Sequence, residues 1–274
     1  MNKLSQQKQT QVVSASVEGN SIRATVRMTG VAKNTIVKLL ADLGMACAEY
    51  QDRVFKNLLC KRIQCDEIWS FCYAKEKNVP KDKKDVFGYG DVWTFTAICA
   101  DTKLVPAWHI GRRDLENATL FMKDLSSRLA NRVQLTTDGH RMYLGAVEDA
   151  FGGDIDYSQL IKLYGDTPDG QKRYSPARCT GTIKTRIIGN PCEAHVSTSY
   201  VERQNLTMRM SMRRFTRLTN GFSKKIENLF YAVSLHFMHY NFCRIHQTLR
   251  VTPAMEARVT DHVWEIEEML NLMK

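Results

Sequence analysis

Several features that would place this chain outside the cytoplasm or in a membrane are missing from its sequence. No apolar run approaches the roughly 18 residues that a membrane span needs. The polar start "MNKLSQQKQTQ" lacks the apolar stretch of a secretion signal. No two of the eight cysteines are spaced as C-x-x-C, the spacing common in zinc and redox sites. We therefore expect a cytoplasmic protein without membrane attachment.

The cysteines that are present favour buried free thiols over disulfides or a metal site. Cys65, Cys72 and Cys99 lie in apolar, strand-like runs, where cysteine behaves as a small hydrophobic residue. The contrary case is a zinc site formed by Cys179, Cys192 and His195, which lacks an evident fourth ligand. Whether these three residues bind metal stays open at this point.

Acidic residues are scarce in two segments, and those segments account for the whole net charge of +10. Residues 1–60 carry eight Lys or Arg against four acids, and residues 199–225 carry seven against the single acid Glu202. Concentrated positive charge attracts the phosphate backbone of nucleic acid. A solvated basic surface without a ligand is the alternative. DNA is the expected partner, so we expect the protein in the nucleoid.

The first 58 residues predict a helix-turn-helix DNA-binding domain. The pattern gives a helix that ends near Gly19, a short helix from Ser21, a turn at Thr29-Gly30 and a third helix from about Ala32. In a helix-turn-helix the second helix of the motif enters the major groove with its N-terminal residues on the bases. A three-helix packing without DNA has the same pattern. The residues expected to face DNA are Lys33, Asn34, Thr35 and Lys38.

Residues 61–250 predict an α/β domain, a mixed sheet flanked by helices. Three β-rich segments follow one another, and then helix, strand, helix, strand and helix alternate. Residues 165–198 are polar and contain Gly and Pro, so we expect an insertion or a long loop there. Residues 251–274 are expected to form a C-terminal helical tail in which Thr252 caps a helix that starts at Pro253.

Three acids occupy positions in this order that point to metal chemistry. Asp66 lies within the first strand, Asp138 ends the fourth strand, and Glu202 lies in the helix after the fifth. If the first and fourth strands are neighbours, these carboxylates converge and need cations to offset their repulsion. Hard oxygen ligands suit Mg²⁺ or Mn²⁺. Two such ions can activate a water or hydroxyl and stabilise the leaving oxygen in phosphodiester displacement.

Each of the first two acids has a competing interpretation. Glu67 follows Asp66, and strand alternation puts the two on opposite faces, so we expect only one of them to serve and favour Asp66. Asp138 precedes Gly139, a common turn signature, but ligands also gather at the C-terminal ends of strands. His140 is an accessory candidate for contacting phosphate or orienting water, although a lone His is more often structural.

Glu202 has no basic residue three or four positions away on its helix, so an intrahelical ion pair is excluded. Arg209 and Arg213 lie seven and eleven residues on and are expected to share its helix face, beside Asn205. The neighbouring stripe of Val201, Met208, Met212 and Phe215 is expected to pack on the sheet. Glu202 would then hold metal while the basic face holds DNA phosphates. The candidate DNA contacts in this segment are Asn205, Arg209, Arg213, Arg214 and Arg217.

These segments together resemble a known family, the transposases of the insertion sequence 1 type. The resemblance runs from about residue 65 to residue 257 and is carried by "CDEIWSF", "GDVWTFTAI", "LTTDGHRMYL", "STSYVERQNLTMRMSMRRFTRLTNGFSKKIEN" and "HYNFCRIHQTLRVTPAMEA". It implies an Asp-Asp-Glu recombinase of ribonuclease H-like fold, with Asp66, Asp138 and Glu202 as the catalytic, metal-binding triad. The implied activity is cutting at the ends of an insertion element and joining the 3′-OH to target DNA.

Two further hypotheses follow from the same residues. A non-catalytic DNA-binding protein, such as a repressor or a domesticated transposase remnant, would need the helix-turn-helix and the basic charge alone. A plain nuclease of the same fold would hydrolyse DNA without joining a 3′-OH to a target. Chemistry on two element ends also predicts a homodimer or larger assembly on DNA. Some relatives carry a cysteine-rich zinc module ahead of the helix-turn-helix, and this sequence begins without one.

Overall fold

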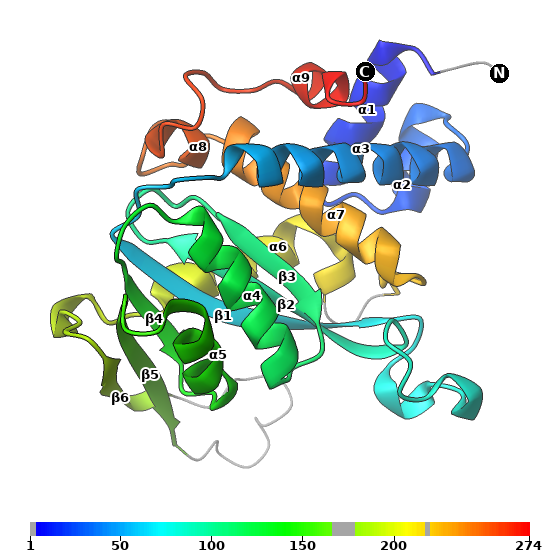
Figure 1. Cartoon of the computed structure of the whole chain (residues 1–274). Helices are drawn as coiled ribbons and strands as arrows, with labels where there is room; N and C mark the ends of the chain where they lie inside the picture. Colours follow the sequence, from blue (N-terminus) through cyan, green and yellow to red (C-terminus); the bar gives the residue numbers. More distant parts are fainter. Residues whose placement is uncertain (1–3, 166–178, 217–219) are drawn as a thin grey trace.

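One mixed sheet of six strands forms the centre of the computed structural model, which describes residues 4–165, 179–216 and 220–274 (Figure 1). The strand order is β3-β2-β1-β4-β5-β6. Strands β1, β2 and β3 pair antiparallel with one another, β4 and β5 run parallel to β1, and β6 is antiparallel to β5. The strands span β1 Arg62–Cys72, β2 Gly90–Cys99, β3 Ala107–Gly111, β4 Gln134–Asp138, β5 Asp156–Tyr164 and β6 Cys179–Ile188.

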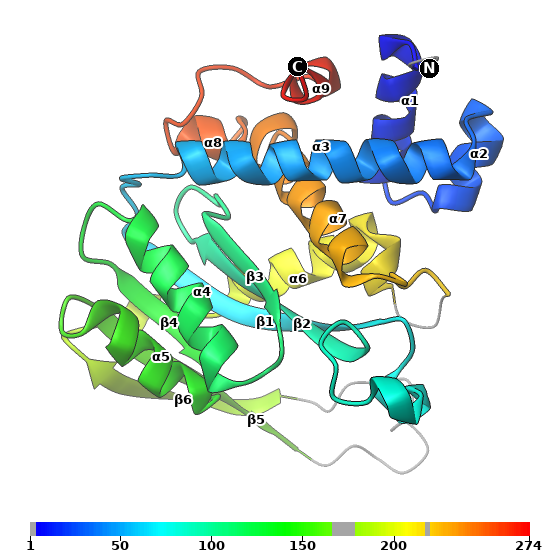
Figure 2. The same ribbon diagram turned by 45° about the vertical axis from the view of Figure 1, so that its right-hand side comes forward.

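Helices cover both faces of this sheet, which confirms the expected fold class. Figures 1 and 2 show α4 and α5 on one face, and α6 on the other. The long helix α3 and the crossing helix α7 lie over one end of the sheet. The helices span α1 Gln6–Val17, α2 Ile22–Thr29, α3 Lys33–Val54, α4 Leu115–Arg128, α5 Met142–Phe151, α6 Ser199–Ser211, α7 Ile226–Met238, α8 Pro253–Glu256 and α9 Ile266–Asn271.

Alternation along β1 divides the core into two clusters, one on each face of the sheet. Ile63 and Cys65 pack with the buried residues of α4 and α5. Ile68 and Cys72 pack instead with α6 and α7. Because successive side chains of a strand point to opposite faces, the parity of a β1 residue decides which helices it meets. Asp66 thus leaves the strand toward α6.

The N-terminal helices follow the expected layout and share the core of the sheet domain. Ser21 caps α2, and Gly30 ends it in the left-handed conformation with φ of 70°. Helix α3 crosses α7 so closely that a Cβ on Gly44 would lie 2.6 Å from Tyr231. The Ser234 hydroxyl of α7 also donates a hydrogen bond to the Gly44 carbonyl at 2.7 Å. The second half of α3 is therefore fixed on the body of the protein.

The segment 165–198 differs from the expected loop, because it contains the edge strand β6. Residues 166–178 of that segment lie outside the described residues. Strand β6 was not predictable from hydrophobic pattern, since its residues are exposed or half-buried on both faces. Its pairing with β5 along the backbone holds it in the sheet instead.

The C-terminal tail packs on the helical layer, and its helix α8 starts at the residues that the capping signals predict. The Thr252 side chain accepts a hydrogen bond from the Met255 amide at 3.2 Å, and Pro253 occupies the first turn of α8. In α9, Met269 and Leu270 are buried in the same core as α1. No helix in the described part of the chain is both long and apolar enough to cross a membrane.

Candidate active site

Parallel pairing of β1 and β4 brings Asp66 and Asp138 to the same end of the sheet. The register pairs Cys65 with Thr137, so Asp66 and Asp138 are the next residues on each strand. Strand β4 ends at Asp138, whose Oδ1 accepts a hydrogen bond from the His140 amide at 3.1 Å. This side-chain-to-backbone bond closes the turn that the Asp-Gly pair predicts.

Glu67 joins these two acids, contrary to the expectation that only one of Asp66 and Glu67 faces the site. One oxygen from each of Asp66, Glu67 and Asp138 lies within 4.8 Å of the others. The two β1 side chains do leave the strand on opposite faces. Pairing between β1 and β4 stops at Cys65 and Thr137, and β4 ends one residue later at Asp138. Beyond this point no β4 backbone separates the side chains of Asp66 and Glu67 from Asp138. We call Asp66, Glu67 and Asp138 the acid cluster.

Buried partners hold Glu67 in place. Its side chain is fully buried, and the Tyr143 hydroxyl of α5 donates a hydrogen bond to Oε2 at 2.7 Å. The guanidinium of Arg113 pairs with Oε1, and its Nη2 also lies 3.7 Å from Oδ2 of Asp138. Arg113 therefore supplies a positive charge in direct contact with the acid cluster. Arg113 also stacks over Trp93, 4.7 Å from the centre of the ring.

The carboxylates of the acid cluster are buried close together and repel one another. Burial, and then the charges of Glu67 and Asp138, raise the pKa of Asp66 from its ordinary value of 3.8 to about 7. Burial and the charge of Asp138 also raise the pKa of Glu67. Converging carboxylates of raised pKa are stabilised by a divalent cation, and hard oxygen donors are the ligands of Mg²⁺ and Mn²⁺. The donor set of this site fits such an ion.

Glu202 lies beside the acid cluster but is paired with a lysine. Lys162 of β5 places Nζ 2.5 Å from a Glu202 carboxylate oxygen, and the Thr198 hydroxyl donates to Oε1 at 2.5 Å. The partner comes from a strand and not from the same helix, so the absence of a base on the helix did not exclude an ion pair. Glu202 is still near enough that its charge contributes to the raised pKa of Asp66.

Asn205 contacts the acid cluster directly, although its place in the sequence predicted a surface contact with DNA. It lies one turn after Glu202 on α6 and is only 4% exposed. Its Nδ2 donates a hydrogen bond to Oδ2 of Asp66 at 2.8 Å. The signal in the sequence was the spacing of three residues from Glu202, which places both on one side of the helix.

Helix α6 ends at Ser211, which corrects the expectation that Arg213 shares the helix face of Glu202. Met212 is extended, with φ of −129° and ψ of 112°. The Thr216 hydroxyl donates a hydrogen bond to the Arg209 carbonyl at 3.2 Å and so satisfies a carbonyl in the last turn of the helix. The apolar stripe from Val201 to Phe215 is buried as predicted.

The predicted basic contacts differ in exposure. Arg213 is exposed, whereas Arg209 is half-buried. Arg214 is also half-buried and donates from Nε to the Ser223 hydroxyl at 2.7 Å. Burial lowers the pKa of Arg214 to about 10, so it stays charged at neutral pH. Arg217 lies outside the described residues.

On α3, the residues expected to meet DNA are all exposed, and they occupy the first two turns of the helix: Lys33, Asn34, Thr35 and Lys38. Lys38 pairs with Asp42 on the same helix at 2.7 Å. The opposite side of this segment, with Ile36 and Leu39, is buried in the core. The side of α3 that carries the four predicted contacts is therefore open to solvent.

The remaining candidate ligands make hydrogen bonds within the protein and form no metal-binding group among the described residues. His140 begins the turn into α5, where its Nδ1 accepts a hydrogen bond from the Met142 amide at 3.3 Å. Nδ1 of His195 lies 3.0 Å from an Arg62 guanidinium nitrogen. In the part of the chain that the structure describes, the acid cluster alone has metal-binding geometry, so Cys179, Cys192 and His195 do not meet. All eight cysteines are free thiols, and five of them are buried.

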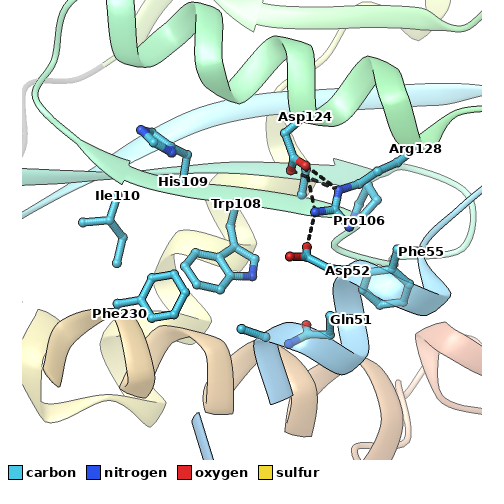
Figure 3. A pocket seen from close by; sticks show the side chains of 12 residues that line it. Gln51, Asp52, Phe55, Pro106, Trp108, His109, Ile110, Asp124, Arg128 and Phe230 are labelled. Carbon is cyan, nitrogen blue, oxygen red and sulfur yellow. Dashed lines mark hydrogen bonds and ion pairs between the residues drawn. The ribbon is translucent and has the colours of Figure 1, made fainter. Parts of the chain in front are cut away.

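A separate cavity of about 280 Å³ lies between the helical layer and the sheet (Figure 3). Trp108 and Phe230 form its apolar wall. On the other side Arg128 pairs with Asp124 and Asp52, so its charge is already matched. No residue of the acid cluster lines this cavity.

Comparison with known proteins gives distant matches to solved structures. No protein-family model matches the sequence, and no curated protein matches it either. The fold is similar to a piggyBac transposase synaptic complex with hairpin DNA, at 10% identity and a TM-score of 0.42 over 98% of this chain and 70% of that one. It is also similar to the Mos1 strand transfer complex, at 11% identity and a TM-score of 0.26 over 87% of this chain and 76% of that one. With TM-scores below 0.5, neither match assigns a function to this chain.

Proposed function

We propose that this chain is a metal-dependent DNA transposase that cuts the ends of an insertion element and joins the exposed 3′-OH to target DNA. The observation that carries the proposal is the convergence of Asp66, Glu67 and Asp138 where β1 and β4 stop pairing, with Glu202 beside them. The mixed order of the sheet and the resemblance of the sequence to insertion sequence 1 transposases support the same reaction.

In this proposal Asp66, Asp138 and Glu202 hold two Mg²⁺ or Mn²⁺ ions. A pair of such ions activates the attacking water or hydroxyl and stabilises the leaving oxygen of a phosphodiester. Asp66 must be ionised to bind metal, so with a pKa of about 7 it releases a proton when the site fills. The buried contacts of Glu67 suit it to orient its neighbours.

Glu202 reaches the metal site only by leaving Lys162. The Glu202 and Lys162 side chains are 40% and 29% exposed, and half-exposed ion pairs of this kind contribute only about 1 kcal/mol or less. A divalent cation among three acids is a stronger attraction for a carboxylate than one half-exposed ammonium group. The exchange of partners is therefore accessible.

DNA is the proposed partner at two surfaces. The exposed first turns of α3 would read bases in the major groove. The basic end of α6 and the chain after it would hold phosphates through Arg209, Arg213, Arg214 and Arg217. Because the reaction joins two element ends to one target, we propose a homodimer or larger assembly on DNA, in the nucleoid of the cytoplasm.

The test is cleavage and strand transfer by the purified protein on a duplex that carries the element ends, with Mg²⁺ or Mn²⁺. Asp138→Asn and Glu202→Gln are expected to lower both activities by more than about 100-fold. Asp149→Asn is the matched control, since this exposed acid of α5 lies outside the acid cluster and pairs with Lys123 at 2.7 Å. Wild-type cleavage by either site variant would refute the assignment.

A non-catalytic DNA-binding protein is the second candidate, and the ion pairs favour it. Arg113 and Lys162 already give Glu67 and Glu202 protein partners. This candidate predicts DNA binding that chelators do not change and no nicking by the pure protein. A plain nuclease would nick the duplex in the same assay without forming joined products.

A further inference from the structure

The uncharged side chain of Asn205, on α6, is in direct contact with the acid cluster. It is 4% exposed, and its Nδ2 donates to Oδ2 of Asp66 at 2.8 Å. Its other polar atom, Oδ1, is buried without a hydrogen-bond partner. A buried acceptor without a donor is unfavourable, and native structures keep few of them. The Asn205 side chain is therefore only half satisfied by the protein around it.

Two neighbours of this contact in the sheet and in the helix also carry unpaired polar atoms. Thr96 lies opposite Asp66 in the antiparallel pair of β1 and β2, so its side chain is on the same face of the sheet. Gln204 precedes Asn205 on α6 and is 2% exposed. The Thr96 hydroxyl and the Gln204 amide nitrogen are both buried without a partner. The unpaired atoms of Thr96, opposite Asp66, and of Asn205, which is bonded to it, are typical of a functional site rather than of a finished core.

The position of the amide matches the spacing of two ligands on one metal ion. Mg²⁺ takes octahedral geometry at about 2.1 Å, so two adjacent ligand oxygens lie about 3 Å apart. The amide nitrogen of Asn205 occupies a point 2.8 Å from Oδ2 of Asp66. A half-turn about the Cβ–Cγ bond exchanges the two amide atoms and places Oδ1 at this point. Two oxygens this close repel each other unless a cation lies between them.

We propose that Oδ1 of Asn205 is a further, uncharged ligand of the divalent cation that Asp66 and Asp138 hold. The inference rests on the proposed metal-dependent function and adds a ligand to it. A neutral oxygen completes the coordination without increasing the repulsion that already raises the pKa of Asp66. In the metal-free state the same amide turns its donor to Asp66 and holds that carboxylate in position.

Mn²⁺ binding, measured by electron paramagnetic resonance, tests the proposal without relying on activity. Asn205→Ala is expected to weaken Mn²⁺ binding by at least about tenfold. The matched control is Asn241→Ala, which removes another buried amide, bonded to the Val105 backbone at 3.0 Å on each side. The control variant should lose stability but keep its Mn²⁺ affinity. Unchanged affinity in Asn205→Ala would overturn the proposal.

A second readout needs no variant and distinguishes a ligand from a residue that only positions Asp66. Asparagine labelled with ¹³C at Cγ is incorporated into the wild-type protein, and the ¹³C coupling to bound Mn²⁺ is recorded by electron-nuclear double resonance. A ligating amide places this carbon about 3 Å from the ion and gives a resolved coupling. No coupling at saturating Mn²⁺ overturns the proposal.

Parallel DNA cleavage by the wild-type protein separates this proposal from the function on which it rests. If the protein binds Mn²⁺ and cuts the duplex but shows no ¹³C coupling, only the role of Asn205 fails. If it neither binds Mn²⁺ nor cuts, the metal-dependent function fails as well.

Discussion

Replacing Asp66 with asparagine should make the metal-free protein more stable at pH 8, although the change removes a carboxylate from the candidate active site. The folded-state pKa of Asp66 is about 7, against an ordinary value of 3.8. Each pH unit between these two values is worth about 1.36 kcal/mol, so the difference corresponds to about 4 kcal/mol. The folded protein loses this free energy of stabilisation when Asp66 must ionise. The asparagine of the variant does not ionise, so the variant does not lose it.

The sign follows from where each state releases the proton. The unfolded chain releases it near pH 4, and the folded chain releases it near pH 7. Between these values the folded state binds more protons, so the contribution of Asp66 to stability falls as pH rises and levels off above about pH 7. Asp66→Asn removes this fall, and we expect the variant to be more stable than wild type by about 2 to 4 kcal/mol at pH 8.

Urea unfolding in the presence of a chelator, followed by circular dichroism between about pH 4 and pH 8, measures the effect. The difference between the two proteins is the quantity to compare, because His236 changes stability in the opposite direction. Burial lowers the pKa of His236 to about 3, so its contribution is lost as pH falls below about 6.5. His236 is present in both proteins and cancels in the difference.

Two results would refute this reasoning. One is a difference between Asp66→Asn and wild type that does not change with pH. The other is a variant less stable than wild type at pH 8 without metal. Asp149→Asn is the control, and its effect should stay below about 1 kcal/mol at every pH. Saturating Mn²⁺ should reverse the order at pH 8, because the cation binds the wild-type carboxylate and stabilises the folded state.

Three further predictions concern charge, DNA contact and packing. Arg113→Ala should destabilise the metal-free protein by about 2 kcal/mol or more, since it leaves the buried Glu67 carboxylate without its cationic partner, whereas Arg112→Ala should not. Urea unfolding midpoints of the two variants measure the difference. Lys33→Ala should leave thermal stability unchanged and reduce the salt dependence of DNA binding by about one counterion, measured in mobility-shift titrations. An unchanged slope of log affinity against log salt concentration would argue against a phosphate contact. Gly44→Ala should cost about 1 to 3 kcal/mol in thermal unfolding, because its Cβ would meet α7 at 2.6 Å, while Gly153→Ala, which meets nothing within 4 Å, should be tolerated.

Local pattern predicted the elements that have a buried face. The turn at Gly30 and the strand that ends at Asp138 follow from capping and alternation, and both lie where expected. The closeness of Asp66 and Asp138 was predictable once the first and fourth strands were taken as neighbours. Strand β6 was not, because backbone pairing holds it in the sheet while its side chains stay largely exposed.

The finer arrangement of the site depends on contacts between residues far apart in the chain. Glu67 reaches the acid cluster because β4 is shorter than β1 on that side, and no local pattern gives the relative lengths of two strands. The partner of Glu202 is Lys162, 40 residues earlier, and only the packing of α6 over the sheet brings them together. The end of α6 likewise involves the Thr216 side chain, which lies five residues beyond the helix and donates to the Arg209 carbonyl.

Under the proposed function, the fixed crossing of α3 over α7 bears on the position of the cut in DNA. Helix α3 has 22 residues and is therefore about 33 Å long, close to one turn of B-form DNA. Its exposed first turns would read sequence, while its second half is held against the same core that carries the acids. Helix α3 would then fix the distance between the two sites, so the scissile phosphate would lie at a constant number of base pairs from the sequence that is read. Lengthening α3 ahead of Gly44 would move the cut along the DNA rather than abolish it.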